Sequence, residues 1–496
     1  MDARPHAVVI GSGFGGLAAA IRLGARGYRV TVLERRDAAG GRAYVIRDQG
    51  FVFDSGPTII TAPFLFEELW RLAGRRFADD VTLRTLTPSY ELRFSDGYRL
   101  ACFADAPRMR AEVARLFPQD LAGYDAFMKR SAALCAVAFE QFGHLPFDSV
   151  WKMLRLAPSI LRLRGYRSLH AIVASHVRDP RLRFALSFHP LFVGGNPFTT
   201  SAIYGLIAHL EQRWGVHFAM GGTGSLVQGL VKLITLQGNE IQYNRDVVQI
   251  LVRGGQARGV RLANGQNIAA DIVVSNADAA WTYRDLLSDT PRRHWTDTRV
   301  ARARYSMGLF VWYFGTSRTY PHIPHHSILV GPRYEALLKD IFARKHLAAD
   351  FSLYLHRPTA TDPSLAPPGA DTFYVLAPVP NLKSGTDWAQ QAEPYRKKIE
   401  EFLEKEFLPD LAKSVVTSHV MTPQDFHAQL LAYEGAAFGM EPILTQSAWF
   451  RPHNRSEDVD RLYLVGAGTH PGAGVPGVLS SARILDQVVP NAYQFS

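Results

Sequence analysis

The stretch that decides the fold is AVVIGSGFGGLAAAIRLGARGYRVTVLE, residues 7–34. Its apolar, β-branched run from Val8 to Ile10 predicts a buried parallel strand. Glycines in G-x-G-x-x-G spacing follow, and then an Ala- and Leu-rich segment predicts a helix from Leu17 to Gly24. A second apolar strand is expected from Arg29 to Leu33. A strand, glycine turn, helix and strand in this order predict a dinucleotide-binding βαβ unit.

Each glycine in this unit has a physical role. Gly11 permits a tight turn, Gly13 lets the backbone approach a pyrophosphate, and Gly16 lets the helix pack closely on the strand. The helix N-terminus offers free N–H groups to the phosphates. Glu34 ends the second strand, where a carboxylate can accept hydrogen bonds from ribose hydroxyls and would repel the extra phosphate of NADP. The predicted site also includes Ser12, Phe14, Gly15 and Arg35.

A second glycine-rich loop lies near the other end of the chain, in RLYLVGAGTHPGAGVPGVLSSAR, residues 461–483. We expect a short strand from Leu462 to Val465, then a loop whose bare backbone can touch a ligand, then a helix from Val478. One ligand touched by both ends of the chain must be long, which favours FAD. The predicted contacts in this loop are Gly466, Ala467, Gly468, Gly474, Val475 and Pro476.

The residues after Glu34 complete a longer pattern, GxGxxGLxxAxxLxxxGxxVxVLExxxxxGGR, which ends at Arg42. This pattern resembles the FAD-binding signature of the amine oxidase and phytoene desaturase superfamily. LYLVGAGTHPGAGVPG and HPLFVGGNPFTTSAIYGL, residues 189–206, also resemble segments of bacterial carotenoid desaturases. The resemblance implies FAD, with Gly41 and Arg42 near its pyrophosphate or flavin end. It further places Gly56, Pro57 and Thr58 near the flavin ring and Val247 beside the adenine.

The fold class expected is α/β: a Rossmann-type FAD-binding domain built from discontinuous segments and interleaved with a second domain. The segment 239–278 alternates like paired strands, with Asn264-Gly265 as a hairpin turn. By the resemblance, this region returns to the FAD domain. We therefore assign residues 1–84, 216–280 and 426–496 to the FAD-binding domain. Residues 85–215 and 281–425 are assigned to an α+β domain that binds the substrate and associates with the membrane.

One run within the second domain, residues 184–210, contains no Lys, Arg, Asp or Glu, although 20% of the whole chain is charged. Its central Gly-Gly-Asn-Pro, residues 194–197, should break a helix, so we reject a membrane span. Composition alone leaves two interpretations open, a substrate-site wall and a buried core. The resemblance implies a long polyene hydrocarbon, phytoene, which would be desaturated to lycopene by successive removal of hydride and proton. An uncharged wall suits such a substrate.

The net charge of +10 favours an anionic partner. WKMLRLAPSILRLRGYR, residues 151–167, mixes five basic residues with Trp and Leu and has no acid, which is typical of an interfacial anchor for anionic lipid. Pro158 predicts two short helices there. A second basic run, Arg292 to Arg304, contains Trp295. Solvated helix faces are the alternative for both runs. The expected location is cytoplasmic, peripherally attached to the inner face of the cell membrane.

No catalytic base, metal-ligand spacing or nucleic-acid-binding motif is evident. His470 lies in the ring-end loop and Arg155 in the basic segment, and we expect structural or membrane-facing roles for both. By the resemblance, a quinone or oxygen reoxidises the flavin. Three alternatives stay open: a three-step, neurosporene-forming or other carotenoid desaturase; an oxidase of polar amines; and a non-catalytic lipid-binding escort protein on the same fold.

Overall fold

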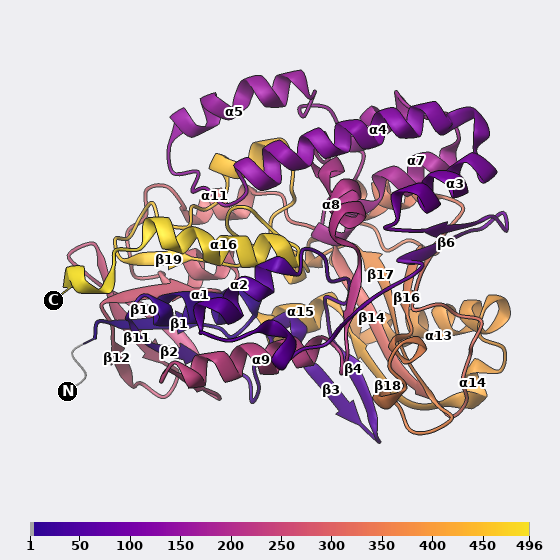
Figure 1. Ribbon diagram of the computed structural model, residues 1–496. Coiled ribbons are helices and arrows are strands. Elements are labelled where there is room, and N and C mark those ends of the chain that lie inside the picture. The colour runs from indigo at the N-terminus through magenta and orange to yellow at the C-terminus, as the bar shows by residue number, and fades with distance from the viewer. Residues whose placement is uncertain (1–3, 496) are drawn as a thin grey trace.

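The computed structural model describes residues 4–495 and is organised around two large β-sheets (Figure 1). The first is a five-stranded parallel sheet with the order β19-β13-β1-β2-β9. Its strands come from distant parts of the chain: β1 (His6–Ile10), β2 (Arg29–Leu33), β9 (Glu240–Gln242), β13 (Ile272–Ser275) and β19 (Leu462–Leu464). The two strands predicted at the N-terminus are therefore present, in the middle of a sheet that the C-terminal segment completes.

Both faces of this sheet are covered, which explains why β1 is apolar from Ala7 to Ile10. One face, with Ala7 and Val9, packs against the helices α1 (Phe14–Ala25), α2 (Phe64–Leu72), α9 (Thr223–Leu236) and α16 (Val475–Val488). The other, with Val8 and Ile10, packs against a three-stranded antiparallel sheet of β10 (Val247–Arg253), β11 (Gln256–Leu262) and β12 (Asn267–Ala269). The predicted hairpin at Asn264-Gly265 joins β11 to β12.

The second large sheet has seven strands in the order β18-β14-β17-β16-β15-β6-β7, and only β15 and β6 pair in parallel. These strands are β6 (Tyr90–Phe94), β7 (Arg99–Cys102), β14 (Gly308–Thr316), β15 (His326–Val330), β16 (Leu353–His356), β17 (Asp371–Val379) and β18 (Val415–Met421). Along β14, Phe310, Trp312 and Phe314 pack toward α13 (Trp388–Glu406). Leu309 and Val311 alternate with them and point to the opposite face.

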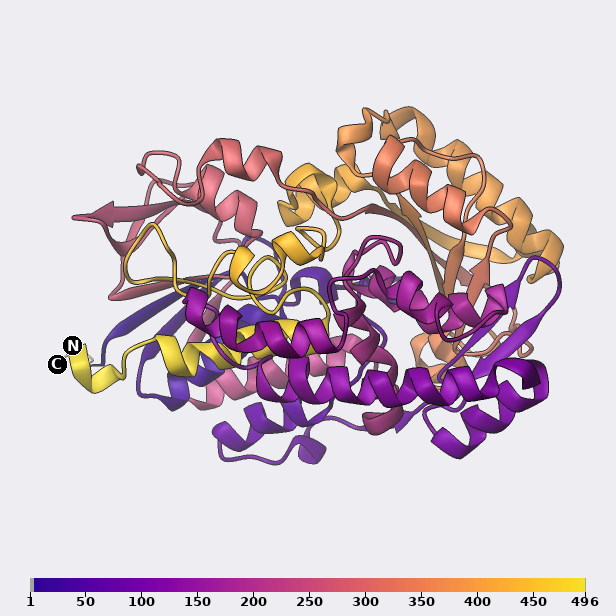
Figure 2. The same ribbon diagram turned by 90° about the horizontal axis from the view of Figure 1, so that it is seen from above.

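A layer of helices lies over that opposite face (Figure 2). It consists of α3 (Ala106–Leu116), α4 (Leu121–Leu134), α6 (Leu169–Ala174), α7 (Pro180–Ser187) and α8 (Leu206–Trp214). The helix α5 (Val150–Arg162) lies farther along, on the side of the molecule that holds α16 (Figure 1). The remaining elements are β3 (Val45–Asp48), β4 (Phe51–Asp54), β5 (Leu83–Thr85), β8 (His217–Ala219), α10 (Ala279–Trp281), α11 (Asp297–Arg302), α12 (Tyr334–Lys339), α14 (Leu411–Ser414) and α15 (Pro423–Leu430).

The helix boundaries near the glycine loops differ from the expectation. α1 begins at Phe14 and not at Leu17, and α16 begins at Val475 and not at Val478. In α16 the early start is compatible with Pro476, because the first turn of a helix has no intrahelical partner for its N–H groups. Both helices therefore start directly at a glycine, Gly13 and Gly474.

The prediction of two short helices around Pro158 is wrong. α5 is one helix from Val150 to Arg162 with Pro158 inside it. A proline removes the hydrogen bond to the carbonyl four residues earlier, here that of Leu154, whose residue is 53% exposed. Water can solvate a carbonyl at such a position, so the helix continues.

The uncharged run 184–210 is broken as predicted. It passes from α7 through a short 3₁₀ turn, His189–Val193, to Gly194 in the left-handed region. A second 3₁₀ turn, Ala202–Gly205, then leads into α8. Among the described residues, no helix is both long enough and apolar enough to cross a membrane.

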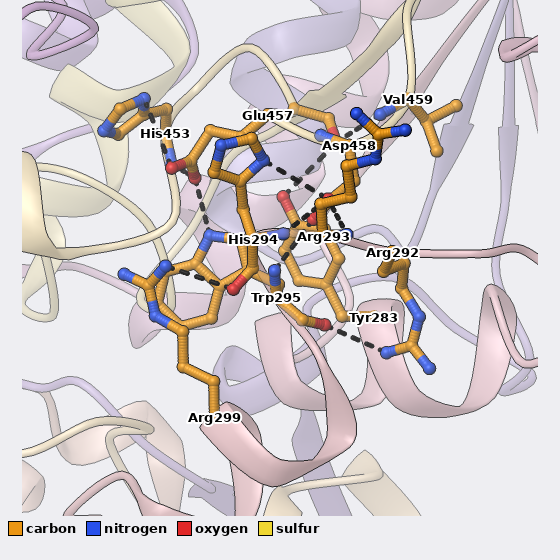
Figure 3. A network of polar contacts seen from close by, with 11 residues as sticks. Tyr283, Arg292, Arg293, His294, Trp295, Arg299, His453, Glu457, Asp458 and Val459 are labelled. Carbon is orange, nitrogen blue, oxygen red and sulfur yellow. Dashed lines mark hydrogen bonds and ion pairs between the residues drawn. The ribbon is translucent and has the colours of Figure 1, made fainter.

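The prediction of an interfacial anchor around Trp295 is also wrong. Trp295 is only 2% exposed and donates through Nε1 to Glu457 at 2.5 Å. Asp458 accepts hydrogen bonds from three successive backbone N–H groups, those of Arg293, His294 and Trp295 (Figure 3). This network ties the basic run to the segment preceding β19. The indole of Trp295 is therefore buried in the protein and is not available to lipid.

Candidate functional site

One cavity of about 610 Å³ connects the two large sheets. The residues proposed from sequence lie in its wall although they come from five separate segments. They are Gly11, Ser12, Gly13, Phe14, Gly15, Glu34, Arg35, Gly41, Arg42, Gly56, Pro57, Thr58, Val247, Gly466, Ala467, Gly468, Gly474, Val475 and Pro476. Gly16 is the proposed residue that is not in the wall. The structure thus brings these residues together, and their individual contacts with a cofactor stay a prediction.

The position of Gly16 explains why it lies outside the wall. A Cβ on Gly16 would stand 2.0 Å from the carbonyl oxygen of Gly11, so only glycine allows α1 to approach β1 this closely. Gly11 itself has a φ of 87°, in the region that favours glycine. Its N–H donates to the carbonyl of Leu33 at 2.8 Å, which ties the start of the turn between β1 and α1 to the end of β2.

The loop that contains Gly40 and Gly41 lies against the first glycine loop. Gly40 N–H donates to the carbonyl of Ser12 at 3.0 Å, and a Cβ on Gly41 would meet Cα of Gly13 at 3.2 Å. Two bare backbone segments are therefore in direct contact at the N-terminus of α1. This arrangement fits the pyrophosphate of an extended dinucleotide.

Glu34 is a buried carboxylate at the tip of β2. Its Oε2 accepts from the N–H of Ser12 at 2.9 Å and from the Ser12 hydroxyl at 2.6 Å, and its Oε1 accepts from the N–H of Arg36 at 2.9 Å. A carboxylate has about four acceptor positions, so one remains for a ribose hydroxyl. Arg35 and Val247 line the cavity beside it. The surroundings of Glu34 match those expected at the adenosine end of the dinucleotide.

Sequence analysis missed two residues that follow β13. Asn276 lies between the two glycine-rich loops, because a Cβ on Gly15 would stand 2.5 Å from its Oδ1 and one on Gly466 2.7 Å from the same atom. Asp278 caps α10 through Ala280 N–H at 2.9 Å, and it faces Arg42. Burial raises the pKa of Asp278 and lowers that of Arg42, while the opposite charges of the two groups counteract both shifts. The available signal was a polar run, Ser-Asn-Ala-Asp, directly after a buried strand.

The other end of the cavity is apolar. Its floor is one face of the seven-stranded sheet, with Leu309, Val311, Ile328 and Leu376. Its roof comes largely from the uncharged run, with Phe184, Phe188, Leu191, Phe192, Val193, Ile203, Leu206, Ile207 and Leu210. Two residues of α5, Leu156 and Ile160, also line it.

A chain of hydroxyls marks the junction between the two ends. Thr58 Oγ1 lies 2.9 Å from the hydroxyl of Tyr354 and 3.1 Å from that of Tyr374, and all three residues line the cavity. The Tyr354 hydroxyl lies 2.7 Å from Nδ1 of His326. Burial raises the pKa of both tyrosines, so both hydroxyls are neutral near pH 7.

Behind this junction, His325, His326 and His356 are the candidate metal ligands of the described residues. Each offers one ring nitrogen, and the three nitrogens lie within 4.8 Å of one another. Burial lowers the pKa of all three imidazoles, which keeps them neutral. The charged group that acts on His325 is the guanidinium of Arg357, a cation that opposes a bound metal ion.

His470 lies in the cavity wall in the C-terminal loop. Burial, and then the charge of Arg451, lowers the pKa of His470 to about 3. The imidazole is therefore neutral at physiological pH, as expected of a residue that shapes the loop.

With this geometry in hand, the comparisons are informative. The family described as flavin containing amine oxidoreductase matches residues 14–484. A protein of Pseudescherichia vulneris named phytoene desaturase (lycopene-forming) is 49% identical over 477 residues, which cover 96% of this chain and 97% of that protein. One of Cereibacter sphaeroides named phytoene desaturase (neurosporene-forming) is 48% identical over 492 residues, which cover 98% and 95%.

Solved structures share the fold at much lower identity. A putrescine oxidase variant with redesigned cofactor binding superposes with a TM-score of 0.68 at 14% identity and covers 99% of both chains. An oxidoreductase from Methanosarcina mazei gives a TM-score of 0.64 at 20% identity and covers 97% of this chain and all of that one. These likenesses concern the architecture alone.

Proposed function

This chain belongs to the flavin-containing amine oxidoreductase family and uses FAD, and from that premise we propose that it is a phytoene desaturase that forms lycopene in carotenoid biosynthesis. The observation that carries the proposal is the continuity of the cavity. Its glycine-lined end suits a dinucleotide, and its other end offers a long, uncharged polyene an apolar floor and roof.

The chemistry divides between cofactor and protein. Bound FAD supplies the acceptor for a hydride, and the adjacent carbon loses a proton as the double bond forms. The apolar residues of floor and roof orient the polyene and exclude water. An oxidase of polar amines is disfavoured, because the apolar end offers an amine few polar partners. A non-catalytic escort role is disfavoured by the intact glycine loops. A quinone or oxygen is the acceptor we propose for reoxidation.

The segment 189–206 resembles that of bacterial phytoene desaturases, which supports phytoene as the substrate, and we propose lycopene as the product. The neurosporene-forming enzymes stay the alternative, since relatives of both names are almost equally similar to this chain. The motifs described above are shared by the two groups.

The membrane-facing surface that we propose is the outer side of α5. Trp151, Leu154 and Leu161 are 71%, 53% and 62% exposed, next to Arg155 and Arg162. The inner side of the same helix contributes Leu156 and Ile160 to the cavity. A basic, apolar helix that exposes one side and lines the cavity with the other suits a contact with anionic lipid, through which a hydrocarbon could pass from the membrane into the cavity. This supports peripheral attachment at the inner face of the cell membrane.

The test is pigment analysis. The chain is expressed in cells that make phytoene, and the product is identified by chromatography and absorption spectrum. Lycopene supports the proposal, and neurosporene would assign the three-step reaction. Unchanged phytoene in the presence of folded, FAD-containing protein would reject both.

A further inference from the structure

The proposed reaction must release a proton inside a cavity built to exclude water, so the cavity needs a proton acceptor. This inference rests on the proposed function. Hydroxyls at the junction, those of Thr58, Tyr354 and Tyr374, are very weak bases in their neutral form. Protonating His470 would create a second cation beside Arg451 in apolar surroundings, which burial opposes. A carboxylate has the opposite property, because taking up a proton removes a buried charge.

Four acidic residues line the cavity: Glu34, Asp246, Asp278 and Glu211. The first three lie at the dinucleotide end. The Glu34 carboxylate accepts hydrogen bonds from the N–H groups of Ser12 and Arg36. Asp246 lies 3.8 Å from Arg35, and Asp278 caps α10. Glu211 is the acidic residue, among the described cavity residues, that belongs to the apolar roof.

Glu211 comes directly after the uncharged run 184–210 and is the first charged residue beyond it. It lies on α8 one turn after Ile207, and both residues line the cavity. It is only 6% exposed. Burying a carboxylate in an otherwise uncharged wall costs free energy, which points to a function.

The contacts of Glu211 hold one side of the carboxyl group and leave the other free. Its Oε2 accepts from the hydroxyl of Tyr90 at 2.9 Å and lies 3.5 Å from Nε2 of His189. Its Oε1 is buried and has no hydrogen-bond partner. Since the terminal torsion of a glutamate is soft, the carboxyl group can turn a free oxygen toward a substrate.

The strand register places this group near the junction. Ser327 pairs with Glu91 between β15 and β6, so Tyr90 lies across the strand pair from His326. His326 is bound to Tyr354, which is bound to Thr58. Glu211 therefore stands close to the part of the cavity where the polar and apolar ends meet.

We propose that Glu211 is the proton acceptor of the desaturation. One C–H bond of the polyene breaks with its electron pair, which leaves as hydride to the oxidised flavin. The C–H bond on the neighbouring carbon then breaks, its electrons form the new C=C bond, and its proton goes to the Glu211 carboxylate. When the product leaves, the carboxyl group returns the proton to water.

The experiment compares wild type with Glu211→Gln, both loaded with FAD and given phytoene in vesicles without oxygen. Flavin reduction is followed by absorbance, and phytoene binding by quenching of tryptophan fluorescence. We expect binding to persist and reduction to slow about 100-fold or more, the usual size of a general-base effect. Glu140→Gln, a change at an exposed glutamate, is the matched control. Glu211→Asp should recover part of the rate.

A second readout does not depend on turnover rate. Infrared difference spectra of the reduced against the oxidised wild type should show a protonated carboxyl band that shifts in D₂O and is missing from Glu211→Gln. Reduction of Glu211→Gln at the wild-type rate, or a carboxyl band that persists in it, overturns the inference while the proposed function stands. If Glu211→Gln does not retain FAD, Glu211→Asp decides by the same two readouts. A folded wild type that phytoene does not reduce refutes the proposed function instead.

Discussion

The two ends of the cavity are built by different physical means. At the dinucleotide end, glycines, helix N-termini and buried polar groups hold the backbone itself against the ligand space. At the apolar end, side chains from a sheet face and from the uncharged run form the wall, and the backbone hydrogen bonds are internal to strands and helices. The first end is therefore sensitive to the loss or gain of single atoms. The second should tolerate changes of shape and reject charge.

The largest effect is expected from Gly16→Val. Its Cβ would stand 2.0 Å from the carbonyl of Gly11, so α1 must move away from β1 and the first glycine loop must change shape. We expect nearly complete loss of bound FAD and a lower melting temperature, measured by flavin absorbance and calorimetry. Gly97→Ala is the control for FAD content, because a Cβ there meets nothing within 4 Å and the φ of 86° strains only a turn outside the cavity wall. Normal FAD content in Gly16→Val would show that close helix–strand packing is not required.

Ile207→Asp tests the other end. A carboxylate in the apolar roof loses hydration without gaining a partner, at a cost of about 2 kcal/mol or more. Phytoene conversion should fall about 30-fold or more while FAD remains bound. The measurement is product yield per flavin, with Ile207→Val as a control that keeps the wall apolar. Unchanged conversion in Ile207→Asp would mean that this wall does not contact the substrate.

Glu34→Gln should have an intermediate effect. The amide keeps the size of the side chain and loses the charge that the Ser12 and Arg36 N–H groups bind, at a cost of about 1.4 kcal/mol. We expect FAD affinity to fall about tenfold, measured by titration of the apoprotein. The matched control is Glu240→Gln, an exposed residue on the neighbouring strand β9. Equal FAD affinities for the two variants would show that the charge of Glu34 does not contribute to cofactor binding.

The smallest effect is expected on the outer side of α5. Replacing both Trp151 and Leu161 by Ala removes exposed apolar surface, which should weaken binding to anionic vesicles by about 1 kcal/mol, or about fivefold. Cosedimentation with vesicles measures this. Val416→Ala, at an exposed apolar residue of β18, is the control. If the double variant binds vesicles as well as wild type does, another surface makes the contact.

How much could be predicted from sequence also differs between the ends. The glycine spacing, Glu34 and the C-terminal loop predicted the parallel strands, and the proposed residues other than Gly16 lie in one cavity wall. Local sequence was informative there because turns and close backbone approaches depend on particular residues within a few positions. Asn276 and Asp278 were missed because a polar residue after a strand has many uses.

In the other half of the molecule, sequence patterns were ambiguous or misleading. Two basic runs with Trp looked alike, yet the structure buries Trp295 beneath Glu457 and leaves Trp151 exposed. Which face of an apolar helix meets solvent depends on partners that are distant in the chain. The uncharged run could equally have been core, and only its position over the seven-stranded sheet made it a cavity roof.

By itself, the sequence determined that the chain carries a βαβ dinucleotide site, that a second glycine loop near the C-terminus complements it, and that residues 184–210 avoid charge. The tertiary structure decided that these segments share one cavity, that Arg42 faces Asp278, and that Glu211 enters an apolar wall. The physical reason is range. Backbone geometry is set by neighbours along the chain, whereas burial and electrostatic environment are set by contacts between residues hundreds of positions apart.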